Sequence, residues 1–268
     1  MKDREVGQMR VEREQWGKIP LLHVATEENF EKQVPVVFFL HGHTSAKEHN
    51  LHYAYNLAEK GLRVILPDAL LHGERSEEID DVQITLRFWE IVLTSLEELK
   101  ELKEEAVERG FATEGKIGVA GTSMGGITTL GALKLYPWID VAAVMMGAPG
   151  YVQLAKAQIK QYESKGFTLP MTAEEREKIF ATLEYVDLTK HQQTLKQRPL
   201  FFWHGEQDLT VPFAPTHNFY EAIRADYQEV PNRLHFMREA NAGHAVSREG
   251  MLASVDWLAD HLNVSMKF

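Results

Sequence analysis

The chain has 268 residues, of which 44% are apolar and 25% charged, so its composition is that of a folded globular protein and not of a disordered or fibrous one. Its 29 Lys and Arg residues against 39 Asp and Glu give a net charge of −10, which disfavours nucleic acid as a partner. The chain contains no Cys, which excludes disulfides, a thiol nucleophile and Cys-ligated metals.

The amino-terminal segment has no apolar run of the kind found in secretory signals. Elsewhere the longest apolar runs have about seven residues, whereas a membrane-spanning helix needs about 20. We therefore expect a cytoplasmic protein with no membrane span.

Short apolar runs alternate along the chain with segments of helical periodicity. The mixed segment 8–26 comes first and predicts one or two antiparallel edge strands. The later runs are continuously apolar, which is typical of strands buried on both faces of a parallel sheet. These strands are predicted at Val34–Leu40, Arg63–Pro67, Lys116–Ala120, Val141–Met146, Pro199–Trp203 and Leu234–Arg238.

Helices are predicted between these strands, at 47–60, 81–109, 124–136, 216–227 and 248–261. Ser45 and Glu48 have the spacing of a capping box at the start of the first helix, and Gly61 is suited to its end. The second helix carries apolar residues at steps of three and four, which predicts a stripe packed on the core. The stripe consists of Leu86, Trp89, Leu93, Leu96, Leu99 and Leu102.

Residues 150–198 interrupt the alternation, because they contain no convincing strand. We expect a helix at 151–165 and a second at 173–183, the latter opened by a capping box between Thr172 and Glu175. About fifty residues are too many for a plain crossover. The sequence therefore predicts a single α/β domain over residues 1–268, with 150–198 as a helical lid over one end of the sheet. A lid of this size narrows a pocket but does not build a long lipid tunnel.

Residues 121–125 read Gly-Thr-Ser-Met-Gly and fit the pattern G-x-S-x-G. The motif follows a predicted strand and opens a predicted helix, as a nucleophile elbow does. In that turn the Ser123 hydroxyl would project above the sheet, beside a helix amino terminus that favours developing negative charge.

A serine nucleophile needs a base, and the base needs an orienting acid. On this type of fold the chain order is serine, acid, histidine, and Asp208 and His244 follow the last two predicted strands in that order. Glu206 is a rival for the acid. Asp208 is preferred because Val211-Pro212 resembles the turn that usually follows this acid.

An oxyanion hole needs two backbone donors near the serine. We expect one from the N–H of Met124, directly after the nucleophile. The other is expected from His43, in the loop that follows the strand ending at Leu40. The His43 imidazole would also line the pocket.

With these motifs the sequence resembles the α/β-hydrolases, and more narrowly the small bacterial carboxylesterases near the dienelactone-hydrolase and prolyl-oligopeptidase branch. The matching segments are 41–48, 67–75, 121–126, 204–212 and 243–244, spread over residues 35–260. The resemblance implies an α/β-hydrolase fold and a cofactor-free serine esterase. Together with the lid, it predicts cleavage of short to medium acyl esters through an acyl-enzyme. Relatives usually carry Phe or Tyr at the position of His43, and dienelactone hydrolases use a Cys nucleophile, which this chain lacks.

Other functions use the same residues. A small-peptide hydrolase or an acyltransferase would need the same triad, and a non-catalytic binding module would need only the fold. A zinc site beginning at His41 and His43 is disfavoured, because Ser45 and Ala46 stand where Asp and His are required. The sequence leaves the oligomeric state open.

Overall fold

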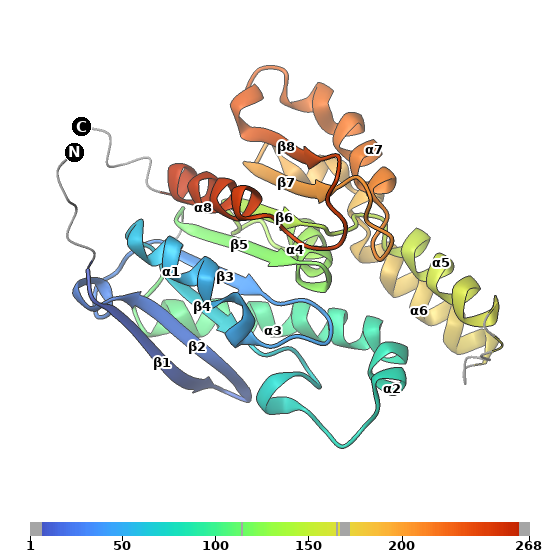
Figure 1. Ribbon diagram of the computed structural model, residues 1–268, viewed down its shortest axis with the longest axis horizontal. Helices are drawn as coiled ribbons and strands as arrows, with labels where there is room; N and C mark the ends of the chain where they lie inside the picture. The colour runs from blue at the N-terminus through green and yellow to red at the C-terminus, as the bar shows by residue number, and fades with distance from the viewer. Residues whose placement is uncertain (1–6, 114, 165, 167–171, 263–268) are drawn as a thin grey trace.

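The computed structural model describes residues 7–113, 115–164, 166 and 172–262. At its centre lies an eight-stranded sheet in the order β1-β2-β4-β3-β5-β6-β7-β8 (Figure 1). The hairpin of β1 (Met9–Trp16) and β2 (Ile19–Thr26) is antiparallel and joins the sheet through an antiparallel pairing of β2 with β4. All other neighbours are parallel, so the mostly parallel sheet with an antiparallel edge is confirmed. The parallel strands are β3 (Val36–Leu40), β4 (Arg63–Pro67), β5 (Ile117–Thr122), β6 (Val141–Met145), β7 (Leu200–Gly205) and β8 (Leu234–Glu239).

Helices cover both faces of the sheet, because the parallel strands present apolar side chains to both sides. Along β3, for example, Phe38 packs into the core beneath α3 and α4, whereas Phe39 packs into the core beneath α1 and α8. Residues of α5, α6 and α7 belong to the first of these cores. The helices are α1 (Leu51–Glu59), α2 (Asp81–Leu86), α3 (Phe88–Glu108), α4 (Met124–Leu135), α5 (Tyr151–Ser164), α6 (Ala173–Val186), α7 (Phe213–Ile223) and α8 (Arg248–Leu262).

Two local predictions are wrong. The capping box of Ser45 and Glu48 does not form: Ala46 is the cap of a 3-10 turn over Lys47–Asn50, and the Ser45 hydroxyl contacts His49 Nδ1 at 3.0 Å instead. The predicted helix 81–109 is interrupted at Arg87, whose φ of −92° and ψ of 11° separate α2 from α3. Because the stripe is interrupted there, Leu86 at its start is exposed, while Leu96 is buried.

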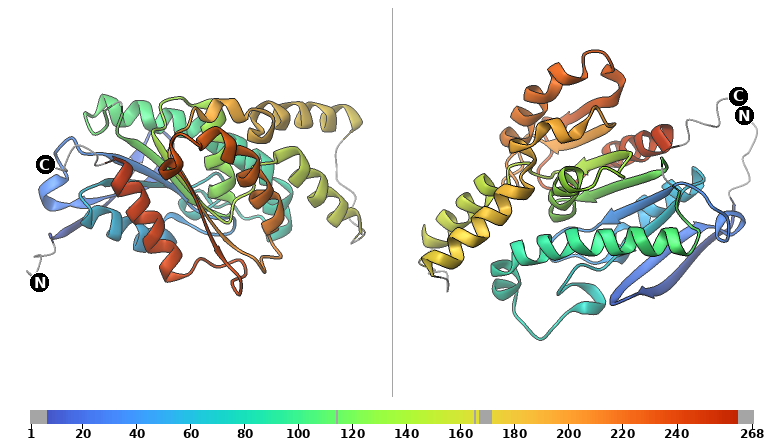
Figure 2. Two further views of the ribbon diagram at one scale, coloured as in Figure 1. Left: turned by 90° about the horizontal axis from the view of Figure 1, so that it is seen from above. Right: turned by 180° about the vertical axis from the view of Figure 1, so that it is seen from behind.

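The segment 150–198 forms α5 and α6 followed by two short 3-10 turns, Leu188–Lys190 and Gln192–Leu195. The capping box of Thr172 and Glu175 is present, as predicted. The two helices lie side by side and extend beyond the carboxyl ends of the strands (Figures 1 and 2). The last residue of the predicted helix 151–165 lies outside the described residues. Within the described part of the chain, no helix combines the length and apolar character needed to cross a membrane.

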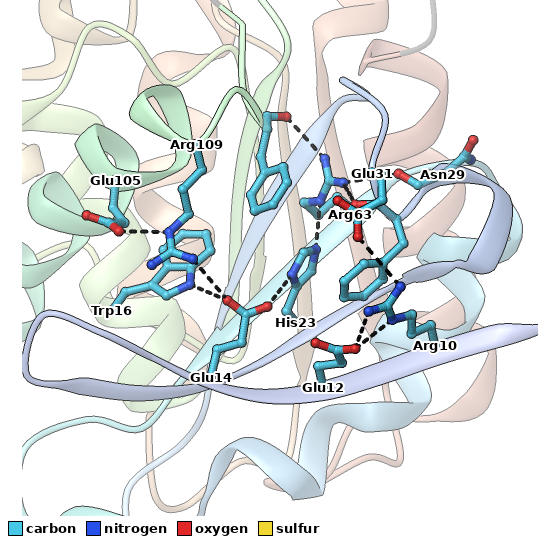
Figure 3. A network of polar contacts seen from close by, with 12 residues as sticks. Arg10, Glu12, Glu14, Trp16, His23, Asn29, Glu31, Arg63, Glu105 and Arg109 are labelled. Carbon is cyan, nitrogen blue, oxygen red and sulfur yellow. Dashed lines mark hydrogen bonds and ion pairs between the residues drawn. The ribbon is translucent and has the colours of Figure 1, made fainter.

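A polar network lies at the amino end of β4, far from the loops that carry the predicted site (Figure 3). Arg63 is fully buried there, and its Nε donates to His23 Nε2 at 2.7 Å. On its other side, His23 Nδ1 contacts Glu14 at 2.7 Å. The Arg63 guanidinium also donates to the carbonyls of Asn29, Phe30, Lys32 and Phe111. The network therefore ties the β1–β2 hairpin to the parallel part of the sheet.

Candidate active site

Ser123 lies in a sharp turn between β5 and α4, at the carboxyl end of a central strand. Its φ of 53° and ψ of −114° are unfavourable for a residue with a Cβ atom. The turn is held by hydrogen bonds from Ser123 N to Met145 O at 2.9 Å and from Ile127 N to Ser123 O at 2.8 Å. A Cβ atom on Gly125 would collide with the Leu40 carbonyl, so glycine allows α4 to approach β3 closely.

Three side chains that are distant in sequence lie in one hydrogen-bonded line. The Ser123 hydroxyl donates to His244 Nε2, with 2.8 Å between the two atoms. His244 Nδ1 in turn donates to Asp208 Oδ2, at 2.7 Å. Asp208 follows β7 and His244 follows β8, so parallel pairing of these strands delivers both loops to the edge of the sheet that holds Ser123.

The Asp208 carboxylate is buried and has several donors. Oδ1 accepts from the N–H groups of Thr210 and Val211, each at 2.9 Å. Burial alone would raise the pKa of Asp208, but contacts with His204 and His244 and the Val211 hydrogen bond outweigh it and hold that pKa well below its usual range. Asp208 is therefore ionised at neutral pH and can orient an imidazole.

Glu206, the rival acid, points elsewhere. Its carboxylate lies 3.5 Å from Arg238 Nε on the neighbouring strand. Of the two carboxylates considered from the sequence, Asp208 is therefore the one in contact with His244.

The loop after β3, which contains His43, passes close to the serine. A Cβ atom on Gly42 would lie 3.6 Å from Ser123 Cβ, so this loop passes directly beside the hydroxyl-bearing residue. In the described part of the chain, no backbone carbonyl outside α4 accepts a hydrogen bond from the N–H of His43 or of Met124.

Two buried imidazoles brace this loop against the loop after β4. His41 Nε2 accepts from the N–H of Ala69, and His72 Nε2 accepts from the N–H of Thr44, each at 3.0 Å. Burial lowers the pKa of His41 to about 4, so it stays neutral and keeps its acceptor nitrogen. These roles are structural, and no cluster of three or more metal-ligating side chains occurs among the described residues.

Sequence reasoning missed a buried ion pair that joins the same two loops. The side chain of Lys47 is fully buried, and its Nζ lies 2.5 Å from Asp68 Oδ2 and 2.7 Å from Glu74 Oε1. Asp68 Oδ1 also accepts from the Lys47 N–H at 3.0 Å. Both partners belong to segments singled out for their family resemblance, but their pairing depends on the adjacency of β3 and β4.

The side chain of His43 connects the loop after β3 to the junction of α2 and α3. Burial, and then the nearby His72, lower the pKa of His43 to about 4. Its Nε2 lies 3.4 Å from the Thr85 hydroxyl, which itself donates to the Asp81 carbonyl at 2.6 Å. The His43 ring also meets the Phe88 ring edge to face, with 5.5 Å between centroids. The loop after β3 is thus in contact with the junction of α2 and α3.

Residues 93–265 match the model of the prolyl oligopeptidase family. Over 254 residues the chain is 46% identical to a protein of Bacillus subtilis (strain 168) named "Putative esterase YitV", with 95% of this chain and 100% of the relative covered. It is 30% identical over 257 residues to "Esterase YjfP" of Escherichia coli (strain K12), covering 95% and 100% of the two chains. The solved structure of TT1662 from Thermus thermophilus has a TM-score of 0.71 at 24% identity, covering 95% of this chain and 98% of that one, and shows a shared fold.

Proposed function

This chain belongs to the prolyl oligopeptidase family and is an esterase-type hydrolase of the α/β-hydrolase fold, and we propose that Ser123, His244 and Asp208 are its catalytic triad. The observation that carries the proposal is the line of hydrogen bonds from Ser123 Oγ through His244 to Asp208, at 2.8 and 2.7 Å. The resemblance and the fold class predicted from the sequence are both confirmed.

In the proposed reaction, His244 Nε2 takes the hydroxyl proton as Ser123 Oγ attacks the ester carbonyl carbon. The carbonyl oxygen becomes an oxyanion, which the N–H groups of His43 and Met124 bind. Collapse of this intermediate breaks the bond to the alcohol oxygen, which receives the proton from His244. Water, deprotonated by the same imidazole, then attacks the acyl-enzyme, and release of the carboxylic acid restores the serine.

The ionised Asp208 supports both halves of this cycle. Its carboxylate accepts from His244 Nδ1, so the acceptor nitrogen of the neutral imidazole faces Ser123. When His244 becomes positively charged, the same carboxylate stabilises it.

We further propose that residues 150–198 act as a lid in a single catalytic domain and that the substrates are esters of short to medium acyl chains. The position of α5 and α6 beyond the carboxyl ends of the strands supports this (Figure 2). A cover at that edge would exclude water and limit the size of the acyl group.

The proposal is tested by labelling the protein with a fluorophosphonate and locating the adduct by mass spectrometry. We expect the label on Ser123, and we expect Ser123→Ala to lower kcat for p-nitrophenyl acetate by about 10³-fold or more. Ser164→Ala, which alters an exposed serine on α5, serves as the control and should react as the unaltered protein does. A label on another residue, or Ser123→Ala activity within tenfold of the parent, would contradict the assignment.

A further inference from the structure

A groove of about 420 Å³ lies between the α2–α3 junction and the pair α5 and α6. We call it the α3–α5 groove. Its walls are mainly apolar and include Phe88, Trp89, Leu93, Ile159 and Phe180. Trp89 Nε1 donates to Gln158 Oε1 at 2.9 Å, so the indole is held across the space between α3 and α5. The volume is in the range of pockets that hold small organic molecules.

The groove adjoins the proposed active site through two of its lining residues. Thr85 and Phe88 both line the groove, and both contact the imidazole of His43. The N–H of the same His43 is one of the two proposed oxyanion donors. The near end of the groove therefore meets the side chain of the residue whose N–H is proposed to bind the substrate's carbonyl oxygen.

The positions of the other groups decide which part of an ester can enter the groove. The alcohol oxygen must face His244, because that imidazole protonates it as it leaves. His244 lies in the loop that leads into α8, and α8 packs with α1 on one face of the sheet. The groove is built from α3, α5 and α6, whose buried residues belong to the core on the other face. The carbonyl oxygen is taken up by the proposed N–H donors of His43 and Met124, and the alcohol faces His244. The acyl substituent is therefore the group that is left to point into the groove.

We propose that the α3–α5 groove is the acyl-binding subsite and that it selects unbranched apolar acyl chains of roughly six to ten carbons over acetyl, since apolar walls favour each added methylene. The inference rests on the proposed esterase function and names the substrate class of that site. Ile159 and Ile179 line the groove from α5 and α6, so their side chains set the space available to the far end of the chain.

The test measures kcat/KM for p-nitrophenyl acetate, butyrate and octanoate. Ile159→Trp and Ile179→Trp should fill the groove and lower the octanoate-to-acetate ratio about tenfold, the scale on which apolar pockets discriminate chain length. Val107→Trp makes a similar change at an exposed apolar site on α3 outside the groove, and should leave the ratio unchanged. Circular dichroism spectra check that each variant is folded.

A second series separates acyl binding from alcohol binding. The unaltered protein should bind n-octylboronic acid more tightly than n-butylboronic acid, measured as inhibition of acetate hydrolysis. Acetate esters of ethyl, benzyl and naphthyl alcohols should show the same relative rates in the groove variants as in the parent.

An unchanged octanoate-to-acetate ratio in both groove variants would overturn the proposal, as would a change confined to the alcohol series. In either case, labelling of Ser123 by the fluorophosphonate would still support the proposed esterase mechanism. Loss of that labelling would instead overturn the proposed function itself.

Discussion

His204 Nε2 lies 3.4 Å from Asp208 Oδ2, so the carboxylate that contacts His244 faces a second imidazole. His204 is fully buried on β7, and its Nε2 donates to the Val211 carbonyl at 2.9 Å. That bond closes the turn whose N–H groups bind Asp208 Oδ1. His204 therefore positions the Asp208 carboxylate, and it does so without contacting Ser123.

The first prediction concerns this positioning role. His204→Leu removes the donor to Val211, so the Asp208 turn should loosen and kcat for p-nitrophenyl acetate should fall roughly tenfold, with KM little changed. His204→Gln retains a donor and should recover most of the loss. Steady-state kinetics of the two variants check this. Equal kcat values for Leu and Gln at this position would show that the hydrogen bond is not what matters.

The second prediction concerns the identity of the acid. Asp208→Asn should lower kcat by about 10³ to 10⁴-fold, because an amide cannot stabilise the imidazolium and favours the wrong tautomer of His244. Glu206→Gln is the matched control, since this carboxylate lies against Arg238 and should change kcat less than threefold. If the Glu206 variant were the more damaged of the two, the roles would be reversed.

The third prediction concerns stability and pH. His41 is neutral in the folded protein, where burial lowers its pKa to about 4, whereas in the unfolded chain it titrates near 6.5. Between these values the unfolded chain binds a proton that the folded protein does not, so the free energy of unfolding decreases as the pH falls from 6.5 to 4. For His41 the full effect is about 3 kcal/mol.

Urea unfolding at pH 7, 6 and 5 measures this dependence. His41→Gln keeps a polar side chain but cannot titrate, so its free energy of unfolding should fall less steeply over the same interval. A slope identical to that of the parent protein would show that His41 is not the group responsible.

The fourth prediction concerns the network at the amino end of β4 (Figure 3). Arg63→Met removes the donor for four buried or partly buried backbone carbonyls and for His23, and should lower the free energy of unfolding by about 3 to 5 kcal/mol. The network lies at the opposite end of the sheet from Ser123, so kcat of the folded protein should be unchanged.

Arg10→Met is the control for this variant. Arg10 belongs to the same network but is partly exposed and pairs with Glu12, so its loss should cost less than about 1 kcal/mol. Urea unfolding midpoints and p-nitrophenyl acetate kinetics measure the two effects. If Arg63→Met and Arg10→Met lowered the free energy of unfolding by similar amounts, burial of Arg63 would not explain its contribution to stability.

Features set by neighbouring residues were predictable from the sequence. The continuous apolar runs indicated a parallel sheet because such strands are buried on both faces. The glycine pattern around Ser123 indicated a sharp turn between strand and helix, and the Thr172–Glu175 box set the start of α6. Local pattern failed at Ser45, where the chain forms a 3-10 turn whose Lys47 pairs with the distant Asp68, and at Arg87, where the helix breaks.

By itself, the sequence also determined the order in which serine, acid and histidine occur, but not that they meet. The hydrogen bond between Ser123 and His244 spans 121 positions and exists because β5, β6, β7 and β8 lie in sequence order across the sheet. The Lys47–Asp68 pair and the α3–α5 groove likewise arise between elements that no short pattern relates. Contacts between distant segments depend on strand order and packing, which are properties of the whole fold, and so only the tertiary structure decided them.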